Sequence, residues 1–308
     1  MLVHDIYSQP EAADPVLDER TVLDLARRHG VRGSAVTAVD ETGGEARVYA
    51  IDETLVVKVQ RPHRRRPRTS LEKEAFFLQQ LSAHPDIVVP QVLGYGRHDP
   101  IEYLVMTRMP GVSALTVELT GGPRRHVLHE LGRTLRRLHA IPQAPFADST
   151  LFPGNRTREA FVDHMRATLA HAVRVVDDTP HLWAFGVSAA DVASRALVTL
   201  PASIDLVALH SNPGPVHTFV HPETLAFVGL IDFGDAYIGH PAFDWRWPTH
   251  ADHLALLQGY ADDAPLTDAF MAAWRAGLVL SDMAALATRP DRRPQALERL
   301  RDLVKTLA

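Results

Sequence analysis

Hydrophobic and polar residues follow one pattern in the first third of the chain and a different pattern in the remainder. In the first third, short runs of β-branched, aromatic and other apolar residues predict strands. These runs are 36–39, 46–50, 54–59, 88–96 and 102–106. The segment 40–45, which contains two glycines, separates the first two runs and predicts a hairpin. The first three runs in series predict an antiparallel meander.

Helical spacing of apolar residues occurs twice in the first third and dominates the rest of the chain. The predicted helices are 21–29, 70–81, 123–140, 157–176, 189–197, 250–260, 265–280 and 294–307. Ser70 stands at the start of the second helix as an N-cap, and Gly30 follows the first helix as a stop signal. Residues 1–20 are polar with two prolines and are expected to form an arm.

Two further apolar runs, 206–209 and 227–231, predict strands that both end in polar side chains. The first is followed by the segment from His210 to His217, and the second by Asp232. Because both strands finish in residues that bind ligands or transfer protons, we expect them to lie together as the floor of one active site.

The succession of elements predicts an α+β protein of two lobes with a cleft between them. The N-terminal lobe is expected over 1–106, including the arm at 1–20. A hinge is expected over 107–112, where Pro110 and Gly111 interrupt the pattern. The helical C-terminal lobe, expected over 113–308, would carry the catalytic, metal-binding and substrate sites.

Composition narrows the class of protein. Of the 308 residues, 46% are hydrophobic and 22% are charged, which is typical of a soluble globular protein. The net charge of −5 argues against a nucleic-acid partner. The absence of cysteine excludes disulfides, thiolate metal sites and a cysteine nucleophile. The 17 histidines are scattered and lack the spacing of a zinc-binding helix.

Neither a membrane nor a targeting segment is expected. No apolar run approaches the roughly 18 residues that span a bilayer. Residues 1–5 lack the basic segment followed by an apolar segment that marks a signal peptide. These patterns predict a cytoplasmic enzyme without a membrane partner, either a monomer or a homodimer.

Lys58 is the residue of the first third whose position most clearly suggests a chemical role. It interrupts an otherwise apolar strand, so its ammonium group either extends to solvent or faces an anionic partner. Glu74 lies beside the apolar face of the helix at 70–81, where an unpaired carboxylate would be costly. An ion pair between Lys58 and Glu74 would satisfy both groups and direct the ammonium group toward phosphates. The basic segment 63–68 between them is expected to be a solvated loop.

Five short motifs stand in one order along the chain. They are Gly43-Gly44, Lys58, Glu74, the segment from His210 to His217, and Asp232-Phe233-Gly234. Their order and spacing, from about 36 to 244, resemble the aminoglycoside phosphotransferase family, which includes antibiotic kinases and choline-type kinases. The resemblance implies a protein-kinase-like fold, with an antiparallel N-terminal lobe carrying one helix and a mostly α-helical C-terminal lobe. It also implies transfer of the γ-phosphate of ATP or GTP to a hydroxyl of a small molecule, such as an aminoglycoside or another hydroxylated metabolite.

The resemblance assigns a role in nucleotide binding to residues of the N-terminal lobe. Gly43 and Gly44 would lie on the hairpin that covers the nucleotide. Lys58 would pair with the α- and β-phosphates, and Glu74 would orient Lys58. These assignments rest on the family and not on spacing alone.

Three further assignments follow from the resemblance. Met106 and Met109 would line the apolar adenine slot. Asp232 would bind the metal ion, Mg²⁺ or Mn²⁺, because such ions prefer carboxylate oxygens. Asp244 matches an aspartate that supports the catalytic loop.

The catalytic segment departs from the family pattern H-G-D-x-x-x-x-N. His210 occupies its first position, but Asn212 replaces the catalytic aspartate and His217 replaces the metal-binding asparagine. An amide cannot take a proton near neutral pH, and a general base contributes about 10²–10⁴-fold to a rate. An imidazole at position 217 suits Mn²⁺, Zn²⁺ or Ni²⁺ better than Mg²⁺.

Three interpretations of the altered segment stay open. The chain could be a phosphotransferase whose base is His217, His210 or Asp235. Alternatively, Asn212 could only orient the hydroxyl in a loose transition state. The third interpretation is a pseudokinase that binds nucleotide for a regulatory role. As a plain loop residue making local turn bonds, Asn212 is compatible with all three.

The sequence specifies the substrate only as a small hydroxylated molecule. Two features of the C-terminal part could bind it: two tryptophans, which could stack on a ring or be core residues, and four aspartates, which could bind a cationic substrate or cap helices. These residues are Trp245, Trp247, Asp252, Asp262, Asp263 and Asp268.

Overall fold

The computed structural model describes residues 7–67 and 69–306. Residues 1–6 of the predicted arm and Arg68 of the basic segment lie outside the described residues, as does the last residue of the helix predicted at 294–307. The chain divides into two compact units. Unit 1 contains the described residues up to Leu119 together with Pro215–Ala236, and unit 2 contains Thr120–Gly214 and the described residues from Tyr237 onward.

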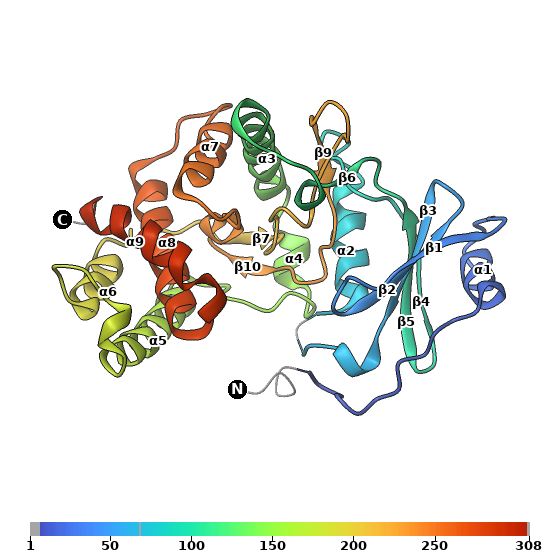
Figure 1. The fold of residues 1–308 in the computed structure, drawn as a ribbon, viewed down its shortest axis with the longest axis horizontal. Helices are drawn as coiled ribbons and strands as arrows, with labels where there is room; N and C mark the ends of the chain where they lie inside the picture. Colours follow the sequence, from blue (N-terminus) through green and yellow to red (C-terminus); the bar gives the residue numbers. More distant parts are fainter. Residues whose placement is uncertain (1–6, 68, 307–308) are drawn as a thin grey trace. The chain divides into compact units, whose positions relative to one another are not determined.

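Unit 1 is built on the predicted antiparallel sheet. Its strands are β1 (Val36–Asp40), β2 (Ala46–Ile51), β3 (Leu55–Gln60), β4 (Val92–His98) and β5 (Ile101–Thr107), in the order β1-β2-β3-β5-β4 (Figure 1). The meander predicted for the first three strands is therefore present. β4 begins four residues later than predicted because Pro90, which has no N–H group, cannot take part in a regular ladder.

Two helices flank this sheet, α1 (Glu19–Arg27) and α2 (Leu71–Leu81). The side chain of Asp18 caps α1 and that of Ser70 caps α2, as expected for Ser70. Alternate residues of β3 point to opposite faces of the sheet. Val57 and Val59 join a core with α1, whereas Lys58 between them reaches Glu74 on α2. The two helices therefore lie on opposite faces of the sheet (Figure 1).

A second, three-stranded sheet completes unit 1. It has the order β6-β8-β9 and consists of β6 (Val112–Ser113), β8 (Thr218–Val220) and β9 (Phe227–Leu230). Gly111 adopts a φ of +84°, and a Cβ atom there would lie 2.4 Å from the Val220 carbonyl oxygen, so only glycine fits this approach. The strand pairing of β6 with β8 places 215–236 in unit 1. The division into units thus differs from the predicted lobe boundary at 107–112.

Unit 2 is mostly α-helical, as predicted for the C-terminal part. Its helices are α3 (Gly121–Ala140), α4 (Ala144–Asp148), α5 (Arg158–Asp177), α6 (Ala189–Val198), α7 (His250–Tyr260), α8 (Asp268–Thr288) and α9 (Arg293–Thr306). Short 3₁₀ turns lie at Pro62–Arg64 and Ala114–Thr116 in unit 1, and at Pro180–Leu182, Pro241–Asp244 and Pro290–Arg292 in unit 2. Helices α3 and α7 are packed so closely that a Cβ atom on Gly259 would lie 1.9 Å from the His129 carbonyl oxygen.

The two strands predicted to form one floor belong to different sheets. β7 (Val207–Leu209) pairs with β10 (Tyr237–Gly239) in unit 2, whereas β9 pairs with β8 in unit 1. Each of the two strands pairs with a short strand that has no hydrophobic periodicity of its own, and their role as the floor of one active site stays a prediction. Strands of three residues, such as β8 and β10, are defined by their partners and not by their sequence.

Helix α8 extends eight residues beyond the segment predicted for it. Among the described helices it is the one whose length and apolar composition would suffice to cross a bilayer. It was not expected from the sequence, because polar residues interrupt its apolar runs. Most of this apolar stretch is buried within the protein, as in the central helix of a helical core.

Two buried histidines of unit 2 make its stability dependent on pH. Burial, and to a smaller extent the nearby His139, lower the pKa of His240 to about 3. Burial and then the charge of Arg299 lower the pKa of His253 to about 3. Both imidazoles are therefore neutral in the folded protein, whereas each titrates near pH 6.5 when the chain is unfolded.

We expect the unfolding free energy of unit 2 to fall as the pH drops below about 6.5, by about 1.4 kcal/mol per pH unit for each histidine. Urea unfolding at pH 7, 6 and 5 measures this, and all four tryptophans, residues 183, 245, 247 and 274, lie in unit 2 and report on it. His253→Gln keeps an N–H donor for the Trp247 carbonyl and should lower the slope by about 1.4 kcal/mol per pH unit, the contribution of one histidine. An unchanged slope in this variant would contradict the prediction.

Candidate nucleotide and catalytic site

Lys58 of β3 is held between two carboxylates of unit 1. Its Nζ atom lies 2.7 Å from Glu74 Oε2 on α2 and 2.7 Å from Asp232 Oδ1 after β9. The side chains of Lys58 and Glu74 are 12% and 1% exposed, while that of Asp232 is 38% exposed. The predicted pair of Lys58 with Glu74 is therefore present. Asp232, which is 174 positions from Lys58 in the sequence, joins it.

The charges in this trio perturb one another strongly. Burial alone would lower the pKa of Lys58, but the Asp232 and Glu74 carboxylates raise it above its ordinary value, so the ammonium group keeps its proton. Burial raises the pKa of Glu74, with Lys58 opposing that effect and Asp232 adding to it. A permanent cation beside a half-exposed carboxylate is suited to bind a phosphate and a metal ion together.

Asp232 follows directly on the end of β9 in an uncommon backbone conformation. Its φ is +70°, a left-handed value that aspartate tolerates better than most residues. His217 Nε2 lies 3.2 Å from Asp232 Oδ2, and the Ile231 N–H donates to the His217 carbonyl oxygen. The structure thus brings His217 and Asp232 together, as a shared metal-binding role would require.

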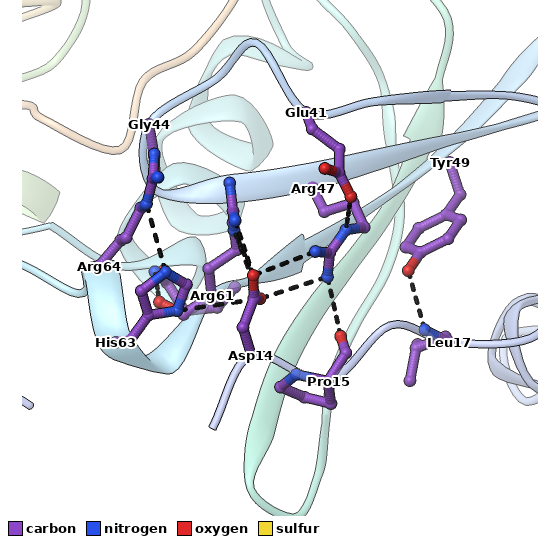
Figure 2. A network of polar contacts seen from close by, with 11 residues as sticks. Asp14, Pro15, Leu17, Glu41, Gly44, Arg47, Tyr49, Arg61, His63 and Arg64 are labelled. Atoms are coloured by element: carbon purple, nitrogen blue, oxygen red, sulfur yellow. Dashed lines mark hydrogen bonds and ion pairs between the residues drawn. The ribbon is translucent and has the colours of Figure 1, made fainter. Parts of the chain in front are cut away.

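Gly43 and Gly44 lie in the exposed turn that joins β1 and β2. Both ends of the turn are held by polar contacts, which Figure 2 shows in part. The Arg47 guanidinium pairs with Glu41 at 2.5 Å, and the Gln60 amide donates to the Glu45 carbonyl oxygen at 2.7 Å. The Arg64 guanidinium also donates to the Gly44 carbonyl oxygen. The hairpin is therefore anchored at its base while its glycines stay exposed.

The described part of the N-terminal arm contributes to this anchoring through Asp14 (Figure 2). Its carboxylate lies 3.1 Å from Arg47 and 2.6 Å from Arg61, two nearly buried arginines. Burial would raise the pKa of Asp14, but hydrogen bonds from Arg61 and Arg47 lower it below its ordinary value. This contact could not be predicted from the sequence, because a carboxylate in a polar arm carries no periodic signal.

Met106 and Met109 are both buried in unit 1. Met109 packs against β9, where a Cβ atom on Gly229 would lie 3.0 Å from the methionine methyl group. That Cβ atom would also lie 2.3 Å from the Val88 carbonyl oxygen, so glycine is required at this position. The apolar surroundings agree with the predicted environment of the two methionines, while their contact with adenine stays a prediction.

The catalytic segment is divided between the two units. His210, Ser211 and Asn212 belong to unit 2, whereas His217 belongs to unit 1. His210 is fully buried, and its Nδ1 atom accepts the N–H of Asn212 at 3.3 Å. The Gly214 N–H donates to the Asn212 carbonyl oxygen, so Asn212 lies in a tight turn.

Asp244 stabilises this turn by accepting hydrogen bonds from its backbone. It is fully buried, and its carboxylate accepts the N–H groups of His210 at 3.0 Å and Ser211 at 2.6 Å. The same carboxylate lies 3.0 Å from His139 Nε2, and the His139 Nδ1 atom lies 3.0 Å from the Tyr260 hydroxyl. Ser211 adopts a φ of +76°, a strained value that these contacts stabilise.

The two tryptophans and the first aspartate considered for substrate binding have structural roles. Trp245 and Trp247 are buried, and the Trp247 indole N–H donates to the Pro213 carbonyl oxygen. Asp252 forms a capping box with Thr249 and an ion pair with Arg124. Asp262, Asp263 and Asp268 are exposed. The core alternative is therefore confirmed for the tryptophans, and the capping alternative for Asp252.

The described part of the basic segment is not a solvated loop. Arg65 pairs with Glu102, and Arg66 pairs with both Glu45 and Asp235. The prediction was wrong because carboxylates far away in the sequence face these arginines. Asp235, one of the three candidate bases, is thus held by Arg66 and by the Thr69 hydroxyl.

The donor atoms at Asp232 and His217 fit a metal ion that is shared with a nucleotide. In the described ranges 7–67 and 69–306, no group of three or more His, Cys, Asp or Glu side chains is arranged to hold a metal. Mg²⁺ in phosphate-transferring sites usually takes only one or two protein ligands and completes its shell with phosphates and water. Asp232 would supply an oxygen donor and His217 a nitrogen donor, a mixed set that suits Mn²⁺, Zn²⁺ or Ni²⁺ better than Mg²⁺.

Comparison with known proteins decides the family. The model of the phosphotransferase enzyme family matches residues 36–287, which is most of the chain. The chain belongs to the phosphotransferase enzyme family. It is also 30% identical over 169 residues to an aminoglycoside 3′-phosphotransferase of Streptomyces ribosidificus. That match covers 53% of this chain and 59% of the relative, so the chain spans little more than half the length of the curated relative.

Solved structures of phosphotransferases share the fold. A macrolide 2′-phosphotransferase of Brachybacterium faecium superposes with a TM-score of 0.60 at 22% identity, over 90% of this chain and 96% of that one. The GDP complex of aminoglycoside 2′-phosphotransferase-IIIa gives a TM-score of 0.60 at 16% identity, over 93% and 98%. The predicted fold class, an α+β protein-kinase-like fold, is thereby confirmed for this member of the family.

Proposed function

We propose that the chain is an ATP- or GTP-dependent phosphotransferase that modifies a hydroxyl group of a small molecule, of the aminoglycoside kind or a related hydroxylated compound. The observation that supports it best is the position of Lys58, 2.7 Å from both Glu74 and Asp232. A lysine with a raised pKa beside a half-exposed carboxylate neutralises phosphate charge, and phosphoryl transfer depends mainly on such neutralisation and on positioning.

The transfer itself exchanges one phosphorus–oxygen bond for another. The substrate hydroxyl oxygen bonds to the γ-phosphorus, while the bond from that phosphorus to the bridging oxygen breaks and a nucleoside diphosphate leaves. A Mg²⁺ or Mn²⁺ ion, when bound, supplies further neutralisation of the phosphate charge. In this chain Asp232 would hold it.

The hydroxyl proton requires an acceptor, and Asn212 cannot be that acceptor. Two of the candidates are disfavoured by their contacts: His210 is fully buried, and Asp235 is held by Arg66. We propose His217, because the Asp232 carboxylate lies 3.2 Å from its Nε2 atom and can orient the ring, as the carboxylate of a catalytic triad does. With the Nε2 hydrogen directed to Asp232, Nδ1 is the basic nitrogen, and His217 as the base is not a metal ligand, so Asp232 is the protein group that would hold the ion.

Nucleotide binding is the first test of the proposal. We expect ATP or GTP with Mg²⁺ or Mn²⁺ to raise the melting temperature, and a panel of hydroxylated compounds to stimulate nucleotide consumption. Failure of every combination to shift the melting temperature would sink the proposal. Binding without turnover on any compound would instead favour a pseudokinase, the alternative that Asn212 suggests.

His217→Asn is expected to lower turnover by about 100-fold or more while nucleotide still binds, because the base is lost and the amide restores a hard oxygen donor. Asn212→Asp is expected to raise turnover in the parent protein and to rescue His217→Asn. Initial rates at saturating nucleotide measure both effects. His221→Asn serves as the matched control, since His221 is an exposed turn histidine of the same unit. Unchanged turnover in His217→Asn would exclude His217 as the base.

A further inference from the structure

Arg66 occupies a position that the proposed mechanism leaves without a role. It lies between the 3₁₀ turn Pro62–Arg64 and α2. One of its terminal nitrogens lies 2.6 and 2.7 Å from the two carboxylate oxygens of Asp235, and its Nε atom forms an ion pair with Glu45. Glu45 adjoins Gly44 on the hairpin, and Asp235 lies three positions after Asp232. Arg66 therefore connects the hairpin to the segment from Asp232 to Asp235, which is called the metal-binding segment after the role proposed for Asp232. All of these residues belong to unit 1.

The stretch between the 3₁₀ turn Pro62–Arg64 and α2, which contains Arg66, also contacts the metal-binding segment through Thr69. The Thr69 hydroxyl donates to Asp235 Oδ1 at 2.7 Å. A Cβ atom on Gly234 would lie 3.3 Å from the Thr69 methyl group, so the two stretches of backbone run close together. The contact of Arg66 is thus part of a packed junction and not an isolated surface pair.

Arg66 also balances charge in this part of unit 1. Burial raises the pKa of Glu45, Arg66 opposes that effect, and the negative charges of Asp235 and Asp232 add to it. Three carboxylates therefore influence one another here, and Arg66 pairs directly with two of them. A planar guanidinium can bridge two carboxylates in fixed directions, which an ammonium group cannot do as well.

We propose that Arg66 is a positioning residue that ties the hairpin at Glu45 to the metal-binding segment at Asp235, and so sets the balance between nucleotide and divalent-cation affinity. The inference rests on the proposed function for its nucleotide part. Without Arg66 the hairpin loses its link to Asp235, and Glu45, Asp232 and Asp235 repel one another and a triphosphate.

This role makes a prediction in which two affinities change in opposite directions. In Arg66→Met we expect the Kd for ATP to rise about tenfold. We expect the Kd for Mn²⁺ alone, without nucleotide, to fall about fivefold, because Glu45 and Asp235 lose their arginine and attract a cation more strongly. Arg66→Lys should lie between the two proteins. Asp235→Asn in the Arg66→Met background should recover part of the ATP affinity, because it removes one repelling charge.

Arg65→Met is the matched control. Arg65 is the preceding residue, is similarly exposed and pairs with Glu102, away from the metal-binding segment. It should leave both affinities unchanged. Equal ATP affinity in Arg66→Met and the parent protein would overturn the inference. So would a joint loss of ATP and Mn²⁺ affinity, which is the signature of general misfolding.

Hydrogen exchange without any ligand separates this inference from the proposed function. Backbone amides of 41–45 and 232–236 should exchange faster in Arg66→Met than in the parent protein or in Arg65→Met. A parent protein that binds no nucleotide would defeat the proposed function, while faster exchange would still support the tie between hairpin and metal-binding segment. Unchanged exchange in Arg66→Met would overturn the tie itself.

Discussion

Asp232→Asn is expected to lower phosphotransfer by at least about 10²–10³-fold, the usual cost of removing one charged group that stabilises a transition state. The carboxylate is the proposed metal ligand and one of two anions that hold Lys58 at 2.7 Å. After the substitution Lys58 keeps Glu74, so its ammonium group stays ordered, but the metal ion loses its main protein oxygen.

Asparagine is the right replacement for this test because of the backbone. Asp232 has a φ of +70°, and asparagine accepts left-handed values as well as aspartate does. Asp232→Ala would add a conformational cost of about 1–2 kcal/mol and mix strain with the loss of charge. Activity assays and nucleotide-induced thermal shifts with Mg²⁺ and Mn²⁺ measure the effect. Turnover within threefold of the parent protein would show that Asp232 does not hold the metal.

Asp244→Ala is expected to destabilise unit 2 by about 3–5 kcal/mol, because it leaves several buried donors without an acceptor. The carboxylate is fully buried and accepts the N–H groups of His210 and Ser211 while contacting His139. Asp244→Asn should cost nearly as much, since its amide hydrogens would face one of these donors.

Urea unfolding followed by tryptophan fluorescence measures this loss, as all four tryptophans lie in unit 2. Asp263→Asn removes an exposed carboxylate of the same unit and should change stability by no more than about 0.5 kcal/mol. A loss below about 1 kcal/mol in Asp244→Ala would mean that water replaces the carboxylate and that the turn at Asn212 does not depend on it.

Elements with a long periodic pattern were predictable from the sequence. The helix predicted at 250–260 has those bounds in the structure, and α2 begins directly after the predicted cap Ser70. The pair of Lys58 with Glu74 also followed from local pattern, since a lysine within an apolar strand and a glutamate beside an apolar helix face both require a partner. Short strands such as β8 and β10 had no such signal, because three residues cannot show a period.

Contacts between distant charges were not predictable. Asp14 lies in a polar arm and Arg66 in a basic segment, and neither segment has a pattern that names its partner. Arg66 and Asp235 are 169 positions apart, and the structure pairs them because β3, α2 and β9 are packed in one unit. The prediction of a solvated basic loop was wrong for the same reason. A run of charged residues is interpreted from its own sequence, whereas the fold brings the carboxylates that pair with it close by.

The sequence by itself determined the long helices and strands, the pairing of Lys58 with Glu74, and the replacement of the catalytic aspartate by Asn212, because these depend on residue type and short-range spacing. The tertiary structure decided that Asp232 joins Lys58, that His217 faces Asp232, and that Arg66 links Glu45 to Asp235. It could do so only by bringing strands far apart in the chain to one place, where burial makes each charge depend on its neighbours.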